Sequence, residues 1–317
     1  MKTQPSELYI SEIKRLKAEK NAVILAHYYQ TGDIQDIADF VGDSLYLSQR
    51  AADNSADIIL FAGVKFMAET AKILAPGKKI LLPDMNAGCS LADSCKAEDF
   101  IEFLEANPGR TVVTYVNTTA EIKALSDIIC TSSNAVQIIE SLPENEKIIF
   151  APDRNLGNYI LNKTGRDIVI WNGTCHVHEE FSLEAIIEMK KENPDAKIIV
   201  HPECELPVRM VADFIGSTSA LLNFTKIDKG KIYIVATEAG IIHQMKKENP
   251  GKNYLPVPPK DSTCGCSECN FMKLITMEKI FYCLLNEEPE IRLPEDLILK
   301  AQKPVRRMME ISEKLGL

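Results

Sequence analysis

The sequence has 317 residues, 45% of them hydrophobic and 26% charged, which is typical of a globular protein with room for two or three domains. A net charge of −9 with scattered basic residues argues against nucleic acid as the main partner. No apolar run approaches the roughly 20 residues of a membrane span, and the N-terminal stretch MKTQPSELYISEIKRLKAEK lacks the apolar core of a signal peptide. We therefore expect a cytoplasmic protein without a membrane partner.

The chain opens with an amphipathic helix predicted over residues 6–20. The apolar run from Ala22 to Ala26 then predicts a buried parallel strand that ends at His27. Residues 33–54 are predicted to form a helix in two pieces, broken near Gly42. A strand over 56–63, a helix over 64–76 and a strand over 78–84 follow, and Cys89 comes just after the last strand.

The same order of elements recurs twice. The second copy has predicted strands over 111–119, 147–153 and 167–173, a broken helical piece over 121–142 and a helix over 155–165. The third has extended runs over 196–205, 231–240 and 252–260, with helical pieces over 208–224 and 241–250. Two further helices are predicted over 271–289 and 298–316. Strands that alternate with helices in this way indicate parallel sheets.

Matching residues recur with a period near 86. His27, Tyr115 and His201, each at the end of a strand, are separated by 88 and 86 residues, and Ser44, Ser132 and Ser217 lie 16 or 17 residues after them. Cys89 and Cys175 are 86 residues apart. The repeat predicts an α/β fold of three similar small αβα domains with parallel sheets, related by a pseudo-threefold axis. We expect the domains at 1–88 (joined by C-terminal helices over 270–317), 89–174 and 175–269.

Ligands of parallel sheets bind beyond the carboxyl ends of the strands, so a threefold arrangement brings the matching strand ends to one central cavity. Each domain would contribute a strand-end ring, a serine and a cysteine. Three thiolates without a fourth ligand suit structural zinc poorly. They suit a [4Fe–4S] cluster whose fourth iron is open to substrate and acts as a Lewis acid.

The nine cysteines are odd in number and irregularly spaced, which indicates reduced thiols. The stretch over 261–272, DSTCGCSECNFM, holds Cys264, Cys266 and Cys269 and cannot close a four-ligand site by itself. A zinc-binding module organised by this CxCxxC run is therefore an alternative hypothesis. Three other cysteines stand in apolar or mixed segments and are predicted to be core thiols: Cys130, Cys204 and Cys283.

Several long motifs resemble the quinolinate synthase family, over residues of about 20 to 285. They are AHYYQ with GDSL, PDMNAGCSLAD, YVNTTAEIKALSDIICTSSNA, APDRNLGNYI, WNGTCHVHEEF, HPECELP with GSTSAL, and ATEAGIIH followed by CSECNFM. The resemblance implies three pseudo-threefold domains around a [4Fe–4S] cluster with three cysteine ligands. It also implies condensation of iminoaspartate with dihydroxyacetone phosphate to quinolinate, phosphate and water, in the synthesis of NAD. Functional coupling to an L-aspartate oxidase or dehydrogenase is a further expectation.

Carried over residue by residue, the resemblance implies the ligands Cys89, Cys175 and Cys269, the last because it precedes a hydrophobic–Met pair in CNFM. The catalytic candidates are Glu203, as general base, with Tyr29, Tyr115 and His201. The implied substrate contacts, to which His178 is added because it flanks Cys175, are His27, Ser44, Tyr115, Val116, Asn117, Ser132, His178, His201, Pro202, Glu203, Ser217 and Thr218. A second enzyme class on a three-lobed, three-cysteine frame, either an isoprenoid reductase or a diphthamide-type enzyme, is the alternative.

Overall fold

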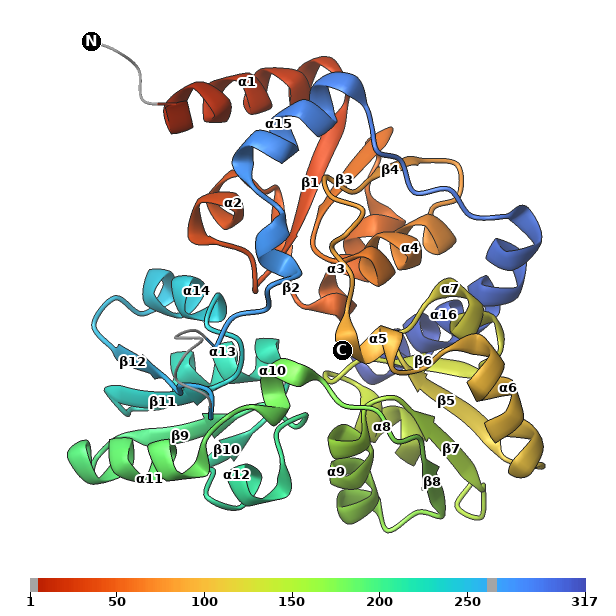
Figure 1. Cartoon of the computed structure of the whole chain (residues 1–317), viewed down its shortest axis with the longest axis vertical. Coiled ribbons are helices and arrows are strands. Elements are labelled where there is room, and N and C mark those ends of the chain that lie inside the picture. Colours follow the sequence, from red (N-terminus) through yellow and green to blue (C-terminus); the bar gives the residue numbers. More distant parts are fainter. Residues whose placement is uncertain (1–4, 261–266) are drawn as a thin grey trace.

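The structure, a computed structural model, describes residues 5–260 and 267–317 and contains three four-stranded parallel sheets (Figure 1). We call the sheets with their helices units 1, 2 and 3. The strands of unit 1 are β1 (Ala22–His27), β2 (Phe40–Gly42), β3 (Ile58–Ala62) and β4 (Lys79–Leu81). Those of unit 2 are β5 (Thr111–Tyr115), β6 (Ile128–Cys130), β7 (Ile148–Ala151) and β8 (Ile168–Ile170). Those of unit 3 are β9 (Lys197–Val200), β10 (Phe214–Ile215), β11 (Ile232–Ala236) and β12 (Asn253–Pro256).

All three sheets have the same strand order, in which the second strand of the unit lies at one edge: β2-β1-β3-β4, β6-β5-β7-β8 and β10-β9-β11-β12. The units lie around a common centre, with unit 1 at the top of Figure 1, unit 2 at the lower right and unit 3 at the lower left. The predicted class, α/β with three similar αβα domains, is confirmed.

Helices cover both faces of the sheets. Those of unit 1 are α1 (Pro5–Glu19), α2 (Gly32–Ile37), α3 (Ser44–Asp53) and α4 (Lys65–Leu74). Unit 2 follows with α5 (Ser90–Asp93), α6 (Ala97–Ala106), α7 (Ala120–Ala124), α8 (Ala135–Glu140) and α9 (Arg154–Thr164). Unit 3 follows with α10 (His176–Glu179), α11 (Leu183–Glu192), α12 (Leu206–Met210), α13 (Thr218–Ile227) and α14 (Ile241–Glu248). The chain ends with the 3₁₀ turn η1 (Met272–Leu274), α15 (Met277–Asn286) and α16 (Glu295–Leu315). Among the residues described, no helix combines the length and apolar character needed to cross a membrane.

The expectation of one broken helix after the first strand of each repeat was wrong. A short edge strand separates two helices in each case, and these strands are β2, β6 and β10. Each has only two or three residues and pairs with a single neighbour. Such a short apolar run between two helical segments has no period of its own, so the pattern resembled one interrupted helix.

An aspartate just before each edge strand ties it to the strand beside it. The side chains of Asp39, Asp127 and Asp213 each accept the backbone N–H of the residue 15 positions earlier, at 2.8 Å. The backbone N–H of each aspartate donates to the carbonyl of that same earlier residue. The same pair of hydrogen bonds therefore fixes the edge strand of all three sheets.

Replacing Asp213 by alanine should lower the free energy of unfolding by about 1–3 kcal/mol, because the N–H of buried Ile198 loses its acceptor. Asparagine keeps an oxygen acceptor at this position, so Asp213→Asn should lower the free energy of unfolding less than Asp213→Ala does. Urea unfolding measures both changes. The exposed Asp195 provides the control, and Asp195→Ala should leave the unfolding curve unchanged. An equal effect of the two alanine variants would contradict the proposed role.

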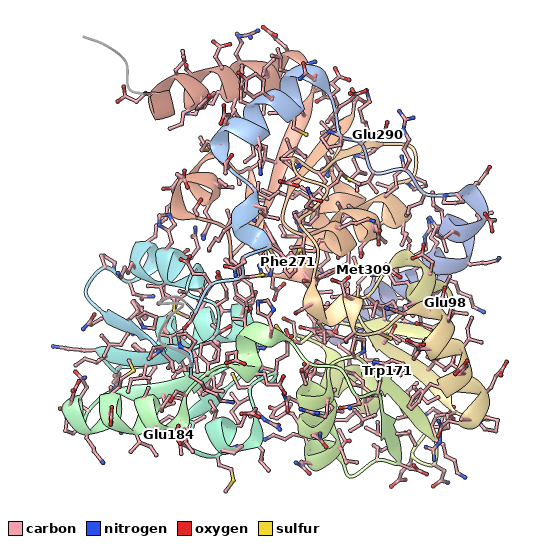
Figure 2. The ribbon with its side chains drawn as sticks, in the orientation of Figure 1. Glu98, Trp171, Glu184, Phe271, Glu290 and Met309 are labelled. Carbon is pink, nitrogen blue, oxygen red and sulfur yellow. The ribbon has the colours of Figure 1, made fainter. Side chains whose placement is uncertain are left out.

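Units 1 and 2 share one continuous hydrophobic core, which also contains Ala301, Val305 and Met308 of α16. The sheet of unit 3 has separate clusters on its two faces, with Ile198 and Ile234 on one face and Ile199 and Val235 on the other. In Figure 2 Phe271 lies near the centre of the molecule, where the chain passes from unit 3 back to unit 1. The central cavity lies where the three units meet.

Candidate active site

One cavity is lined by residues of all three units. It brings together the three cysteines of the predicted ligand set and most of the predicted substrate contacts. From this set the lining includes His27, Tyr29, Ser44, Cys89, Tyr115, Asn117, Ser132, Cys175, His178, His201, Glu203, Thr218 and Cys269. Val116, Pro202 and Ser217 are not among the lining residues. Val116 and Pro202 each lie between two residues that are, and their roles stay predictions.

The repeat also identifies the third hydroxyl of the cavity. Ser44 and Ser132 each lie 17 residues after the strand-end ring of their unit, and in unit 3 that position is Thr218. Ser217, one residue earlier, accepts the backbone N–H of Ala220 and so caps α13. The hydroxyl facing the cavity in unit 3 is therefore that of Thr218.

His27 and His201 are held in the same way at the ends of β1 and β9. In each ring Nδ1 accepts the backbone N–H of the residue two positions later, Tyr29 at 3.2 Å and Glu203 at 3.3 Å. Burial lowers the pKa of His27 to about 4 and that of His201 to about 3. Both rings are thus neutral at pH 7, and because Nδ1 accepts, Nε2 carries the proton. Each ring can donate one hydrogen bond through Nε2.

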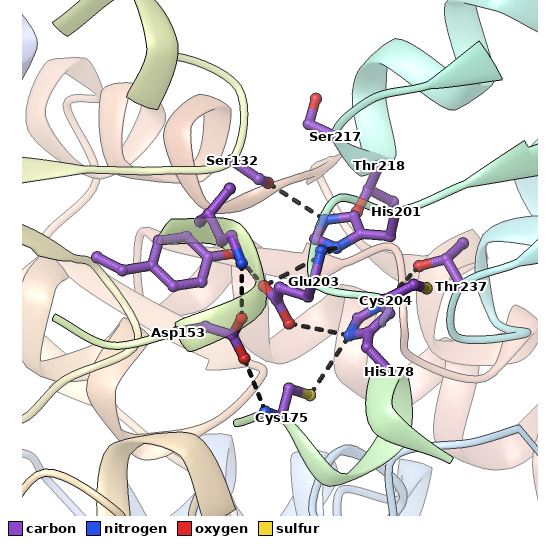
Figure 3. Close-up of polar contacts among 12 residues, drawn as sticks. Ser132, Asp153, Cys175, His178, His201, Glu203, Cys204, Ser217, Thr218 and Thr237 are labelled. Atoms are coloured by element: carbon purple, nitrogen blue, oxygen red, sulfur yellow. Dashed lines mark hydrogen bonds and ion pairs between the residues drawn. The ribbon is translucent and has the colours of Figure 1, made fainter. Parts of the chain in front are cut away.

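Glu203 is the centre of a buried polar network (Figure 3). One carboxylate oxygen lies 2.9 Å from Nδ1 of His178, and the other accepts the hydroxyl proton of Tyr115. The ring of His178 stacks on that of His201, with the centroids 4.4 Å apart. Burial by itself would raise the pKa of Glu203, but the neighbouring rings of His178 and His201 and hydrogen bonds from His178 and Tyr115 hold it at about 2. Glu203 is therefore an ionised carboxylate that is positioned to accept a proton.

Thr237 extends this network and was not identified from the sequence. Its hydroxyl lies 2.9 Å from the Tyr29 hydroxyl and 3.0 Å from Nε2 of His178. The Tyr29 hydroxyl also contacts Thr218 at 3.0 Å. Thr237 is the first residue after β11, where the other two units carry Gly63 and Pro152. Neither has a hydroxyl, so the repeat gave no signal for this site.

Thr237→Val should reduce kcat by about 5- to 100-fold, because Tyr29 and His178 both lose a buried partner worth about 1–3 kcal/mol. Thr237→Ser keeps the hydroxyl and should restore most of the rate. Steady-state kinetics of the two variants checks this. If Thr237→Val had the kcat of the unmodified chain, the Thr237 hydroxyl between Tyr29 and His178 would not contribute to catalysis.

Acidification is expected to destabilise the fold through His27 and His201. Between their ordinary pKa near 6.5 and the folded values of about 4 and 3, the unfolded chain binds protons that the folded chain excludes. Each ring therefore removes stability at up to about 1.4 kcal/mol per pH unit as the pH falls through this window. A His27→Gln, His201→Gln double variant should lose stability less steeply between pH 6.5 and 4 in urea unfolding. Parallel pH profiles would contradict the expectation.

The loops that carry the three cysteines are fixed by one repeated backbone hydrogen bond. The donor is the N–H three residues after the end of the third strand of each unit, and the acceptor is the carbonyl two residues before the cysteine. The three bonds are Lys65 to Ala87 at 2.7 Å, Arg154 to Gly173 at 2.7 Å and Ala239 to Ser267 at 3.0 Å. Cys269 is therefore the structural equivalent of Cys89 and Cys175. Cys264 and Cys266 lie outside the described residues.

The three cysteines are half-buried, and desolvation raises the pKa of each thiol: Cys89 to about 12, and Cys175 and Cys269 above the ordinary value. Backbone N–H groups just after each cysteine lower the pKa of its thiol. They belong to Leu91 and Ala92, to His178, and to Phe271 and Met272. Thiolates in this setting need a nearby positive charge, which a bound metal provides. The donor atoms of Cys175, His178 and Glu203 also lie within 4.8 Å of one another, which is compatible with a metal site.

The predicted core thiols are confirmed, since Cys130, Cys204 and Cys283 are at most 2% exposed. The cavity thus combines three equivalent thiols with an ionised carboxylate, two neutral imidazole donors and three hydroxyls. This combination is that of an enzyme, and the cavity between the three α/β units is its candidate reaction centre.

Comparison with known proteins agrees with this class. The family model "Quinolinate synthetase A protein" matches residues 11–310. The chain is 57% identical over 303 residues to "Quinolinate synthase" of Thermosynechococcus vestitus, covering 96% of this chain and 95% of the relative. It is 58% identical over 308 residues to "Quinolinate synthase" of Microcystis aeruginosa, covering 97% and 96%. The chain belongs to the quinolinate synthase family.

Proposed function

We propose that this chain condenses iminoaspartate with dihydroxyacetone phosphate to form quinolinate, phosphate and water in the synthesis of NAD, and that it works in the cytoplasm. The observation that carries the proposal is the central cavity, in which three equivalent cysteine loops face the Glu203 network. The match to the family over residues 11–310 supports the same reaction.

The proposed cofactor is a [4Fe–4S] cluster held by Cys89, Cys175 and Cys269. The donor set fits this group, because three half-buried thiols stand at matching positions around one cavity. When bound, the open iron of such a cluster supplies Lewis-acid assistance to loss of water. We also propose the domain boundaries given above, 1–88 with 270–317, 89–174 and 175–269.

Neutral donors around the cavity suit the carboxylates of an imino diacid. Nε2 of His27 can donate one hydrogen bond, and the hydroxyls of Ser44, Ser132 and Thr218 can donate three more. Nε2 of His201 lies 3.3 Å from the Ser132 hydroxyl and orients it by donating to its oxygen. Oδ1 of Asn117 is buried and has no hydrogen-bond partner among the described residues. This oxygen can accept a bond from a substrate hydroxyl or amine.

Proton transfer falls to three side chains. Burial raises the pKa of Tyr29 and Tyr115 well above 10, so both hydroxyls keep their protons at neutral pH and act as donors. Glu203 is ionised and lies against His178 and Tyr115, so it is the general base of the proposal. His178 and Thr237 link this base to Tyr29 and give the proton a continuous path between the two.

Iminoaspartate requires a reaction that oxidises the amine of aspartate, so we propose functional coupling to an aspartate oxidase or dehydrogenase. The test uses protein purified and reconstituted without oxygen. It should bind about four irons per chain together with sulfide and should form quinolinate from the two substrates. Zinc without sulfide, dependence on an external electron donor, or cleavage of S-adenosylmethionine would overturn the proposal.

A further inference from the structure

Two buried carboxylates occupy the same repeat position next to the cysteine loops. The position lies two residues after the end of the third strand and carries Val64 in unit 1, Asp153 in unit 2 and Glu238 in unit 3. Asp153 and Glu238 are both 0% exposed. Buried carboxylates are costly unless they are hydrogen-bonded or paired, so their partners indicate what holds them there.

Each carboxylate accepts the backbone N–H of the cysteine that follows the sheet of its own unit. Asp153 accepts from Cys175 at 2.9 Å, as Figure 3 shows, and Glu238 accepts from Cys269 at 3.1 Å. The other oxygen of each carboxylate accepts an N–H near the start of the helix that follows, from Leu156 at 2.8 Å and from Gly240 at 2.7 Å. Each side chain therefore joins two segments, a helix start and a cysteine loop.

The unit 3 carboxylate has a further connection, to unit 1. Nζ of Lys273 lies 2.9 Å from the same Glu238 oxygen and donates to the carbonyl of Tyr29 at 2.7 Å. The charge of buried Glu238 is thus compensated, and the loop of Cys269 is connected to the strand end that carries Tyr29. In unit 1 the side chain of Val64 cannot accept a hydrogen bond, so the loop of Cys89 keeps the repeated backbone bond from Lys65 but has no carboxyl acceptor at this position.

We propose that Asp153 and Glu238 are positioning residues that hold Cys175 and Cys269 in place for metal binding. The inference rests on the proposed function in taking these cysteines as ligands. Two of the three cysteine loops are then held by a buried carboxyl side chain before a cluster arrives, and the loop of Cys89 lacks this contact. Glu238 also lines the cavity, and in this proposal both side chains act through the cysteine loops.

Amide hydrogen exchange in the cluster-free chain tests the proposal without any iron. An amide side chain has a single acceptor oxygen and cannot serve both N–H groups, so Asp153→Asn should break the link between Cys175 and Leu156, and Glu238→Gln that between Cys269 and Gly240. We expect the segment around the corresponding cysteine to exchange roughly tenfold faster, equivalent to about 1.4 kcal/mol. Segments around the other cysteines should keep the rates of the unmodified chain.

Glu69→Gln is the matched control. Glu69 is also a buried carboxylate and accepts a backbone N–H, that of Ala120 at 3.1 Å, but it holds no cysteine loop. This variant should accelerate exchange near Ala120 and leave both cysteine segments unchanged. Unchanged cysteine segments in Asp153→Asn and Glu238→Gln would overturn the proposal, and so would a uniform acceleration over the whole chain.

Iron release supplies the second measurement. From reconstituted protein, Asp153→Asn and Glu238→Gln should transfer iron to a chelator roughly tenfold faster than the unmodified chain and Glu69→Gln. Equal rates in all four proteins would count against the positioning role. If the unmodified chain takes up no iron and sulfide, the proposed function fails, while amide exchange still decides whether the two carboxylates position the loops.

Discussion

Cys269→Ala is expected to reduce the iron bound after reconstitution from about four atoms per chain to almost none, and quinolinate formation should fall below detection. The reason is geometric. The bond from Ala239 to Ser267 places Cys269 in its loop as the corresponding bonds place Cys89 and Cys175. Loss of one of three ligands leaves a cluster with two protein bonds, which cannot hold it in the cavity. Iron and sulfide analysis without oxygen measures the effect.

Three single variants serve as controls for this prediction. Cys264→Ala and Cys266→Ala remove the neighbouring cysteines of the same CxCxxC run, and both should keep iron and activity. Cys283→Ala removes a buried thiol of α15, which should lower stability but leave the iron content unchanged. Full iron content in Cys269→Ala, or its loss in Cys264→Ala, would assign the third ligand to another cysteine.

Glu203→Gln is expected to lower kcat by about 10²- to 10⁴-fold with a small effect on KM, because it removes the proposed general base but preserves its volume. The amide cannot accept protons, and its NH₂ group cannot replace both carboxylate contacts, to His178 and to Tyr115. Iron content should stay at the level of the unmodified chain. This result would separate loss of chemistry from loss of the cluster.

The control for Glu203 lies two residues further along the chain. Glu205 is about one-third exposed and pairs with Lys260 at 2.7 Å at the surface. Exposed ion pairs of this kind contribute little to the free energy of folding, so Glu205→Gln should leave kcat within about twofold of the unmodified value. If Glu203→Gln behaves like Glu205→Gln, another group is the base.

The repeat made most of the fold predictable, because it rests on strands with strong apolar runs such as β1 and β11. It did not reveal β2, β6 and β10, which are too short to show a period and depend on one neighbour and an aspartate for their position. Local sequence cannot show a strand whose stability comes from a pairing made elsewhere in the chain.

In the candidate site, too, some residues could be predicted from the sequence and others could not. Strand ends and cysteines were predicted because their positions repeat, and the cavity brings them together. Thr237 and Lys273 were missed because each acts at one unit only and its partners lie far away in the chain, as with Lys273 and Tyr29. Asp153 and Glu238 do repeat, but their role became clear only from the N–H groups that they accept.

Helix α16 has a consequence for how the protein is made. Its buried residues complete the core shared by units 1 and 2, and Asn134 of unit 2 bonds to Ser312 at 2.9 Å. These contacts join a helix that is synthesised after all three units to the first two of them, so units 1 and 2 leave the ribosome with an apolar face uncovered. A nascent chain in this state exposes surface that chaperones bind. Synthesis of α16, rather than completion of each unit, then sets the moment at which this core can close.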